Sequence, residues 1–457
     1  MSDLPSGWMR TSVGDIAEVR GGIQKQAKRR PVNDKYPFLR VANVGKGMLN
    51  LEEVHEIELF DGELERFAIQ AGDLLVVEGN GSPGEIGRAA MWHGEILNCV
   101  HQNHLICVRP TSVLLPKFLE LLWSSPEIAK QLRDVASSTS GLHTLSTSKI
   151  KAVKICLPPY EEQRRIVAAL EGHLSRLDAA VVSALAAVRK AVALRRRTLG
   201  NLVAPDSSGS WKKCRLEDVT TTVRNGMFVS RPGHEPNGVP ILRISAVRSL
   251  ALDLSDLRYS AKSLEVVQRE GYLLQGGDLL FTRYNGNPEY VGACAVVPEN
   301  VGPLTYPDKL IRVSPDTSIV DSAYLAMACS AGGSRQAIRS AVKTTAGQAG
   351  ISGGEIKRIL LYLPDLDEQR RRAAEFQEHD EAVRHVEENV KSVARRGDYL
   401  RRSLLTEAFA GRLVPQDPAE EPASVLLERI RAEQAAQPRA RRRPKTATHA
   451  PQEETLL

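Results

Sequence analysis

The amino-acid sequence contains an internal duplication, and this feature restricts the fold more than any other feature of the chain. Four pairs of matching segments lie 205 or 206 residues apart: Gly-Asp-Leu-Leu at 72–75 and 277–280, Asn-Gly at 80–81 and 285–286, Leu-Pro at 157–158 and 363–364, and Glu-Gln-Arg-Arg at 162–165 and 368–371. Chance matches would not keep such a constant offset along 457 residues. The pattern predicts two copies of one structural unit.

Each copy is predicted to consist of a globular segment followed by a long helix. In the first copy, 73–77 and 105–108 have the composition of strands, and 115–133 that of a helix broken at Pro126. The predicted division is a globular domain at 1–157, a helix at 158–204, a second globular domain at 205–363, a second helix at 364–412 and a tail at 413–457. The tail is rich in Pro, Ala, Glu and Arg, so we expect it to be mostly disordered, with one short helix at 423–434.

Both long helices carry apolar residues at steps of three and four, the pattern of a coiled-coil seam. The predicted seam consists of Leu170, Leu174, Leu177, Val181, Leu185 and Val188 in the first helix, and of Val383, Val386, Val390, Val393, Leu400 and Leu404 in the second. One helix leads away from the first globular domain and the other leads back, so we expect the two seams to pair antiparallel.

The predicted fold class is therefore α+β, with two tandem mixed α/β domains that are related by a pseudo-twofold internal repeat. An antiparallel coiled coil of the two long helices is expected to separate them. Long helices of this kind are also typical of a scaffold or an oligomerisation device. A pure scaffold, however, has no need for two copies of a loop-rich domain.

Composition is compatible with a nucleic-acid partner without demonstrating one. The formal net charge is +6 at pH 7, which favours a polyanion only slightly. Six cysteines are scattered along the chain and form no Cys-x-x-Cys pair, which is typical of reduced thiols inside a cell. The sequence contains no long apolar run and no signal-peptide pattern, so we expect a cytoplasmic protein without a membrane span.

The motifs together resemble a known family. Each copy opens with a tryptophan that is followed by an aspartate seven residues later, Trp8 with Asp15 and Trp211 with Asp218. Gly-Asp-Leu-Leu, Ile/Val-Gly, Leu-Pro and Glu-Gln-Arg-Arg follow in that order, and the second helix ends in Leu-Leu-Thr-Glu-Ala-Phe-Ala-Gly-Arg-Leu-Val at 404–414. From Trp8 to about residue 433 the chain resembles the specificity subunit of type I restriction-modification systems. The combination of motifs is specific, although each motif alone is weak.

The resemblance implies a non-catalytic subunit with two target recognition domains, each of which reads one half of an asymmetric, bipartite site in double-stranded DNA. It implies that the helices set the spacing between the half-sites and dock two methylation subunits, and that a motor-nuclease subunit joins this core. Adenine methylation and ATP-dependent cleavage would then belong to those partners. S-adenosylmethionine and ATP would bind there too, and this chain would need no cofactor.

Polar residues in the turns of each globular domain are the candidates for DNA contact. In the first domain these are Asn80, Ser82, Arg88, Gln102, Asn103, His104, Ser138 and Thr139; in the second they are Arg283, Asn285, Asn287, Lys309, Thr344, Thr345 and Gln348. Side chains of these types bind phosphates and read base edges. The alternative for each group is an ordinary surface turn. Because Glu78 stands where the second copy has Arg283, the two domains are predicted to read different sequences.

Three other kinds of chemistry fit the sequence poorly. The Gly-x-Gly-x-x-Gly pattern at 79–84 lacks the following helix that a dinucleotide site needs, and its second copy loses two of the three glycines. Cys99, His101, His104 and Cys107 have no standard zinc-ligand spacing, so no metal site is predicted. Leu157-Pro-Pro-Tyr resembles an amino-methyltransferase motif, but leucine cannot accept a hydrogen bond from a target amine. An adaptor that binds only proteins through its coiled coil is the main alternative function.

Overall fold

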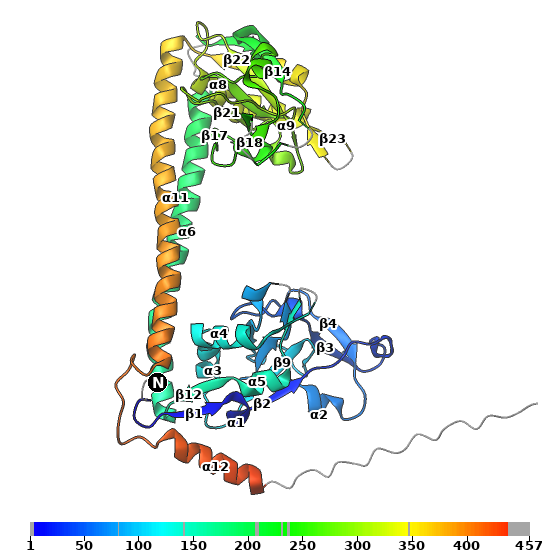
Figure 1. Cartoon of the computed structure of the whole chain (residues 1–457), viewed down its shortest axis with the longest axis vertical. Helices are drawn as coiled ribbons and strands as arrows, with labels where there is room; N and C mark the ends of the chain where they lie inside the picture. The colour runs from blue at the N-terminus through cyan, green and yellow to red at the C-terminus, as the bar shows by residue number, and fades with distance from the viewer. Residues whose placement is uncertain are drawn as a thin grey trace, which may run out of the picture. The chain divides into compact units, whose positions relative to one another are not determined.

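The computed structural model describes residues 4–80, 82–139, 142–205, 210–229, 232–234, 238–345 and 348–436. Contacts divide the chain into two compact units, and the division crosses both long helices. Unit 1 is formed by Met1–Val181 and Ala394–Leu457, and unit 2 by Val182–Val393. Each unit therefore contains one globular domain and part of each long helix (Figure 1).

The globular domain of unit 1 is a mixed α/β structure. Its strands are β1 (Met9–Ser12), β2 (Ala17–Gly21), β3 (Lys35–Leu39), β4 (His55–Glu58), β5 (Leu74–Val77), β6 (Gly79–Asn80), β7 (Ala89–Met91), β8 (Val100–His101), β9 (Leu105–Pro110), β10 (Ser137–Thr139), β11 (Leu142–Thr144) and β12 (Lys154–Leu157). Its helices are α1 (Val13–Ile16), α2 (Glu63–Phe67), α3 (Pro116–Trp123), α4 (Pro126–Val135) and α5 (Thr147–Ala152), with short 3-10 turns η1 (Ala27–Arg29), η2 (Val41–Asn43) and η3 (Pro83–Glu85). The predicted strands at 73–77 and 105–108 and the helix break at Pro126 are confirmed.

An antiparallel sheet in the order β2-β9-β5-β7 forms the centre of this domain. All four residues of β5 are buried, because both faces of the sheet are covered, and this explains its unbroken apolar sequence. Three smaller sheets surround the centre, in the orders β4-β3-β8, β10-β11-β6 and β1-β12. Helices α3 and α4 pack on one face, where Phe118, Leu119 and Leu132 join the largest apolar cluster of the unit.

Unit 2 repeats this plan. Its strands are β13 (Lys212–Arg215), β14 (Thr220–Asn225), β15 (Val239–Ile241), β16 (Val247–Arg248), β17 (Ala251–Leu252), β18 (Arg258–Ser260), β19 (Leu279–Thr282), β20 (Tyr284–Asn285), β21 (Cys294–Val296), β22 (Leu310–Pro315), β23 (Lys343–Thr345), β24 (Gln348–Gly350) and β25 (Leu360–Leu363). Its helices are α7 (Leu264–Arg269), α8 (Ser322–Ser330), α9 (Gly332–Ala341) and α10 (Gly353–Lys357), with 3-10 turns η4 (Leu216–Val219), η5 (Ile244–Ala246) and η6 (Pro288–Tyr290). The sheets β14-β22-β19-β21, β20-β24-β23 and β13-β25 have the same strand order as their counterparts in unit 1, which confirms the structural duplication.

The two predicted long helices are present as α6 (Tyr160–Val203) and α11 (Leu366–Phe409), each of 44 residues. They pack antiparallel within each unit. In unit 1, Arg401 forms an ion pair with Asp178. In unit 2, Arg195 forms an ion pair with Asp380, and Arg372 donates to the carbonyl oxygen of Leu202 over 2.9 Å. Supercoiling of the two helices stays a prediction.

The residues of the predicted seam differ in burial, and their pairing across the two helices stays a prediction. Leu170, Leu174 and Val383 are buried, and Leu177, Val181, Val188, Val386, Val390 and Leu404 are half-buried. Leu185, Val393 and Leu400 are instead 47%, 39% and 47% exposed. The nearby small residues Ala184, Ala191, Ala394 and Gly397 are half-buried. The stepping rule selected large aliphatic residues, and at these three positions the large side chain lies on an exposed side of its helix.

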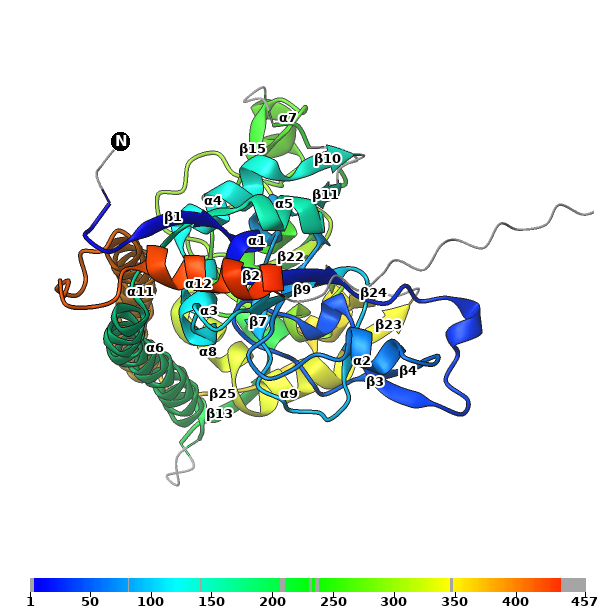
Figure 2. The same cartoon turned by 90° about the horizontal axis from the view of Figure 1, so that it is seen from below.

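The segment after α11 contradicts part of the predicted disorder. Helix α12 (Ala423–Ala436) was expected, but the segment also packs on unit 1 (Figure 2). Ala423, Leu427 and Ile430 lie three or four positions apart and are buried in the main cluster of the unit, which is the physical reason for the order. Glu420 forms an ion pair with Arg165 of α6. Residues 437–457 of the predicted tail lie outside the described residues.

Equivalent glutamines of the Glu-Gln-Arg-Arg motifs join each helix to its globular domain. Buried Gln163 accepts from the Leu115 backbone N–H over 2.9 Å and donates to the carbonyl oxygens of Val113 and Pro158 over 2.8 and 3.2 Å. Buried Gln369 makes the equivalent three bonds: it accepts from the Asp321 N–H over 2.9 Å and donates to the carbonyl oxygens of Ile319 and Pro364 over 3.3 and 3.0 Å. The motif therefore fixes the direction in which each helix leaves its domain.

The other shared motifs also have structural roles. In Gly-Asp-Leu-Leu, buried Asp73 accepts from the Gln70 N–H over 2.8 Å, and Asp278 accepts from the Gln275 N–H over 2.9 Å. In Ile/Val-Gly, Gly87 has a φ of +67°, and a Cβ there would lie 2.6 Å from Leu132 of α4. Residues shared between the copies thus maintain the scaffold, and differences between the copies are the better guide to what each domain binds.

Candidate nucleic-acid interface

Most of the predicted DNA-contact segments meet at one place in each domain, although they are far apart in the sequence. In unit 1 the backbone of Glu78 links two of them: its N–H donates to the His104 carbonyl over 2.9 Å, and its carbonyl accepts from the Leu145 N–H over 2.7 Å. Strand β6, directly after Glu78, pairs with β11, which pairs with β10. The segments around 80, 104 and 138 are therefore neighbours.

Unit 2 contains the same junction. The N–H of Arg283 donates to the Lys309 carbonyl over 2.9 Å, and its carbonyl accepts from the Ile351 N–H over 2.9 Å. Strand β20 then pairs with β24, and β24 with β23. We call these two places the reading edges of unit 1 and unit 2. The first is formed by Glu78–Asn80, Gln102–His104, Ser137–Thr139 and Leu142–Thr144, and the second by Arg283–Asn285, Pro307–Lys309, Lys343–Thr345 and Gln348–Gly350.

The candidate residues at the reading edges and in the turns beside them differ in exposure. His104, Ser82, Asn287, Thr344 and Gln348 are exposed, whereas Gln102, Asn103, Arg283, Asn285 and Lys309 are half-buried. The side chains of Asn80, Ser138, Thr139 and Thr345 lie outside the described part of the chain. Asn285 and Asn287 accept from backbone N–H groups two residues ahead, over 2.9 and 3.0 Å, so part of their role is to shape the turn.

Arg88 has a structural role instead of an exposed one. Its side chain is only 17% exposed, and its guanidinium donates to the carbonyl oxygens of Val44 and Val41 over 2.8 and 3.3 Å. The sequence prediction selected Arg88 for its charge and its place beside the glycine-rich turn. The fold uses that charge to fix the loop that contains η2, so Arg88 is left out of the proposed contact set.

The charges at equivalent positions of the two reading edges are different. In unit 1, His104 Nδ1 lies 2.9 Å from Glu78 Oε2, and the two side chains are 57% and 31% exposed. In unit 2 the same two positions hold Arg283 and Lys309, both cationic. Arg283 donates to the Asp308 carbonyl over 3.2 Å, and its guanidinium carbon lies 4.7 Å from the ring centre of Tyr284. One scaffold thus presents a carboxylate with an imidazole in one copy and two cations in the other.

A loop that the sequence analysis missed begins beside each reading edge. Ile23 and Met227, at its start, are buried, and their N–H groups donate to the carbonyls of His101 and Tyr306. The glycines that precede them allow this close approach, since a Cβ on Gly22 would lie 2.2 Å from the His101 carbonyl oxygen. The next residue in unit 2 is Phe228, which is 77% exposed. The sequence offered only the glycines at 22 and 226 as a signal for this loop, because the exposure of Phe228 cannot be read from it.

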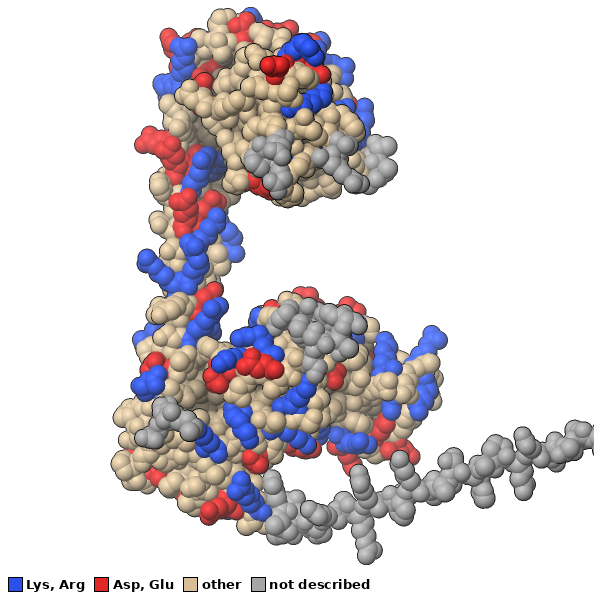
Figure 3. Space-filling model, in the orientation of Figure 1, with Lys and Arg blue, Asp and Glu red and all other residues tan. Residues whose placement is uncertain are grey.

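In unit 1 the corresponding loop is basic. Lys25, Lys28, Arg30 and Lys35 are all exposed, and Figure 3 shows Lys and Arg side chains gathered where this segment projects beside β3 and β4 of Figure 1. Arg29 fixes the segment to α2, because it donates to both oxygens of Glu63 over 2.6 and 2.8 Å, and this pairing lowers the pKa of Glu63 to about 2. A fixed basic loop of this kind suits phosphate contacts.

Three of the four cysteines and histidines weighed as zinc ligands, Cys99, His101 and Cys107, are part of the core. Cys99 and Cys107 are buried in an apolar cluster, and burial raises the pKa of each thiol to about 12. Burial lowers the pKa of His101 to about 4, and its Nδ1 lies 3.1 Å from the Leu105 carbonyl oxygen. Among the described residues, no three His, Cys, Asp or Glu side chains form a group able to hold a metal ion.

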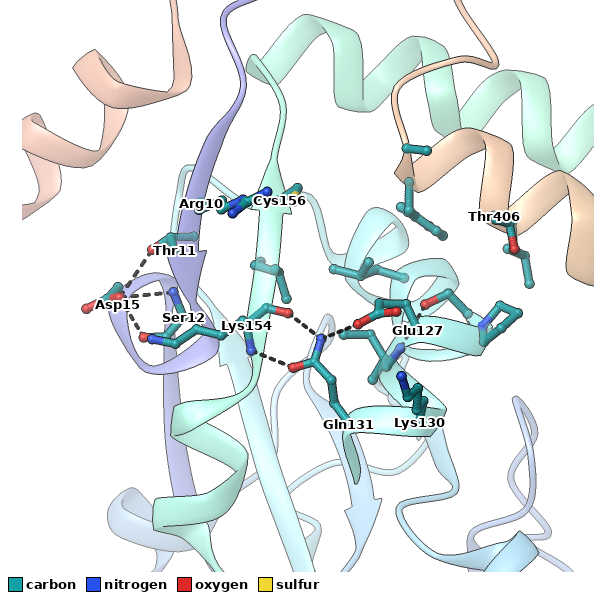
Figure 4. Close-up of a pocket in the computed structure, with 18 of the residues that line it drawn as sticks. Arg10, Thr11, Ser12, Asp15, Glu127, Lys130, Gln131, Lys154, Cys156 and Thr406 are labelled. Carbon is teal, nitrogen blue, oxygen red and sulfur yellow. Dashed lines mark hydrogen bonds between the residues drawn. The ribbon is translucent and has the colours of Figure 1, made fainter. Parts of the chain in front are cut away.

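One pocket of unit 1 is lined by none of the reading-edge residues. It has a volume of about 900 Å³ and is lined by residues of β1, α4, β12, the end of α11 and α12. Its polar groups bind one another: Gln131 accepts from the Lys154 N–H and donates to its carbonyl, each over 2.9 Å, and Asp15 accepts from Ser12 (Figure 4). These groups satisfy one another, and we assign the pocket no role in DNA contact.

The chain belongs to the family of type I restriction modification DNA specificity domains, whose model matches residues 5–180 and 209–392. The two matched segments coincide with the two copies found in the sequence. No helix in the described part of the chain has the length and apolar character that crossing a membrane requires.

Relatives of known name agree with this assignment. The specificity subunit of the type I restriction enzyme EcoKI from Escherichia coli K12 is 29% identical over 455 residues, which covers 95% of this chain and 97% of that protein. A solved structure described as complex assembly and conformational transition of the type I R-M system has a TM-score of 0.70, with 18% identity over 90% of this chain and all of that chain. The HsdS subunit from Thermoanaerobacter tengcongensis has a TM-score of 0.52, with 19% identity over 90% of this chain and 98% of that chain. These structures support the fold.

Proposed function

We propose that this chain is the DNA sequence-recognition subunit of a type I restriction-modification complex. Each reading edge reads one half of an asymmetric, bipartite site in double-stranded DNA, and α6 and α11 set the gap between the half-sites. The observation that carries the proposal is the duplicated junction at Glu78 and Arg283, where one scaffold presents different polar side chains in its two copies. Two similar scaffolds with different contact residues suit a site with two different halves.

The exposed apolar residues of the long helices support docking of methylation subunits. In unit 2, Val182, Leu185 and Leu194 of α6 are 62%, 47% and 58% exposed, and in unit 1 Tyr399 and Leu400 of α11 are 72% and 47% exposed. Large apolar side chains on the outside of a helix are typical of surfaces that a partner covers. This proposal gives the two methylation subunits the outer faces of α6 and α11.

Catalysis belongs to the partners in this proposal. S-adenosylmethionine and adenine methylation are assigned to the methylation subunits, and ATP and DNA cleavage to a motor-nuclease subunit that joins them in the cytoplasm. The polar motif residues of this chain support that division, because Asp73, Gln163 and their counterparts are engaged in holding the fold. A protein adaptor without DNA specificity is disfavoured, since family membership covers both globular domains.

The test is to map methylated adenines in the genome of a host that carries this chain with its methylation subunits, and of the same host without this chain. The proposal predicts one asymmetric motif in two parts, present only with the chain. The assembled complex should also bind DNA that contains this motif more tightly than scrambled DNA, with an affinity that falls as salt rises. A methylation pattern that is the same with and without the chain would contradict the proposal.

A further inference from the structure

We propose that the residue directly after the buried Gly-Asp-Leu-Leu strand, together with its partner across the junction, selects one base in each half-site. In unit 1 the pair is Glu78 and His104, and it reads the exocyclic amino group of a base. In unit 2 the pair is Arg283 and Lys309, and it reads the acceptor edge of guanine. This inference rests on the proposed function and assigns the determinant within each reading edge.

The position of the pair is rigid in both copies, which a base-reading group requires. The strands before it, β5 and β19, are buried along their whole length. The backbone of the first residue is then fixed on both sides by hydrogen bonds of 2.7 to 2.9 Å to the neighbouring segments. A side chain that starts from such a point loses little conformational freedom on binding, so its hydrogen bonds contribute fully to discrimination.

The chemistry of the first pair suits an amino group. A carboxylate can only accept hydrogen bonds, and it accepts well from the N4 amino group of cytosine. Since the imidazole of His104 occupies Oε2 of Glu78, it orients the carboxylate, and the second oxygen can accept from a base. Adenine presents an amino group at N6 as well, so the shared target is an exocyclic amino group in the major groove.

The chemistry of the second pair suits the opposite edge. Guanine presents the acceptors O6 and N7, and arginine or lysine beside them is the commonest specific contact of this kind. The guanidinium of Arg283 is held by the Asp308 carbonyl and by the ring of Tyr284, so it is directed rather than freely mobile. Its Nε is buried without a hydrogen-bond partner among the described residues, which leaves the terminal N–H groups as the available donors.

The test maps the methylated motif of the complete complex with single variants of this chain. Glu78→Gln keeps the size of the side chain but replaces a pure acceptor by an amide, and Arg283→Gln removes the cation. Each variant should accept more than one base at a single position of the motif, Glu78→Gln in one half-site and Arg283→Gln in the other. The preference for the original base at that position should fall about tenfold. Whether the first position is cytosine or adenine is read from the same data. The double variant Glu78→Arg, His104→Lys copies the second pair and should shift that position to guanine.

Glu65→Gln, at an exposed glutamate of α2, is the matched control and should leave the motif unchanged. Melting curves of the purified variants verify folding, and Arg283→Gln gives a second, independent test if Glu78→Gln fails to fold. An unchanged motif with Glu78→Gln and Arg283→Gln would overturn the inference while the proposed function stands. An equal loss of methylation at all motif sites, without a relaxed base, would also overturn it and indicate phosphate contacts. Absence of any motif with the unaltered chain would overturn the proposed function and this inference with it.

Discussion

Replacing Gln163 by alanine should selectively destabilise unit 1. The substitution removes three hydrogen bonds to the backbone of the Leu115 turn and of Pro158, at a side chain that is fully buried. Each such bond contributes about 1 kcal/mol net, so the loss is about 3 kcal/mol, and more if the abandoned N–H and carbonyl groups stay buried without water. For a unit of this size, 3 kcal/mol lowers the melting temperature by roughly 6 to 12 °C.

Tryptophan fluorescence offers an assay that separates the two units. Trp8, Trp92 and Trp123 lie in unit 1, and Trp211 lies in unit 2. In a Trp211→Phe background, the fluorescence transition therefore reports the unfolding of unit 1 alone. Gln163→Ala should lower the melting temperature of this transition by the roughly 6 to 12 °C worked out above, and Gln369→Ala should leave it nearly unchanged.

The exposed Gln26 of unit 1 is the matched control. Its side chain donates one hydrogen bond, to Gln24 over 3.4 Å, and Gln26→Ala should change the stability of unit 1 by no more than about 0.5 kcal/mol. The assignment of the motif as the joint between helix and domain would be refuted if Gln163→Ala lowered the free energy of unfolding of unit 1 by less than about 1 kcal/mol. It would also be refuted if Gln369→Ala shifted the melting temperature of unit 1 by an equal amount.

Three further predictions concern single residues. The folded-state pKa of His101 is about 4, below the ordinary 6.5, so the unfolded state binds the proton more tightly. The free energy of unfolding should therefore be full above pH 6.5 and fall towards pH 4, by about 2 kcal/mol at pH 5. Denaturant titrations at pH 7 and pH 5 should show a smaller fall for His101→Gln than for the unaltered chain. Leu427→Ala should destabilise unit 1 by about 3 kcal/mol in the fluorescence assay above, because Leu427 is fully buried; an unchanged transition would mean that α12 is not part of that core. Phe228→Ala should weaken binding of the assembled complex to its motif by about tenfold in a direct titration, with an unchanged melting curve, because the ring is exposed beside the reading edge. Equal affinity of the Phe228 variant and the unaltered chain would exclude a DNA contact of the ring.

The sequence predicted those parts of the fold that repetition and periodicity encode. The duplication, the buried strand at 74–77 and both long helices could be found because each depends on local composition or on a constant offset. Leu185 and Val393 are exposed although the stepping rule placed them in the seam, because that rule ranks side chains by size and does not register which side of a helix is covered. Which side is covered depends on what packs against the helix and is not encoded in its own periodicity.

The candidate site could be predicted only in part for a related reason. Polar turns such as the one around His104 were visible in the sequence, but their meeting with the segments at 78 and 145 depends on long-range backbone hydrogen bonds. The same packing decided that Arg88 serves the fold. Phe228 was missed because an exposed aromatic side chain has the same composition as a buried one until its surroundings are known.

The hydrogen bonds that Gln163 and Gln369 make at the joint between helix and domain affect how such chains can evolve. All six of its hydrogen bonds end on main-chain atoms, and any incoming sequence supplies main-chain atoms of the same kind. The globular domain can therefore change its side chains around this joint without a compensating change in the glutamine. The apolar contacts of Ile166 and Leu170 with the core of unit 1 still depend on domain side chains, so the freedom to vary is greatest in the polar turns that carry the candidate DNA contacts.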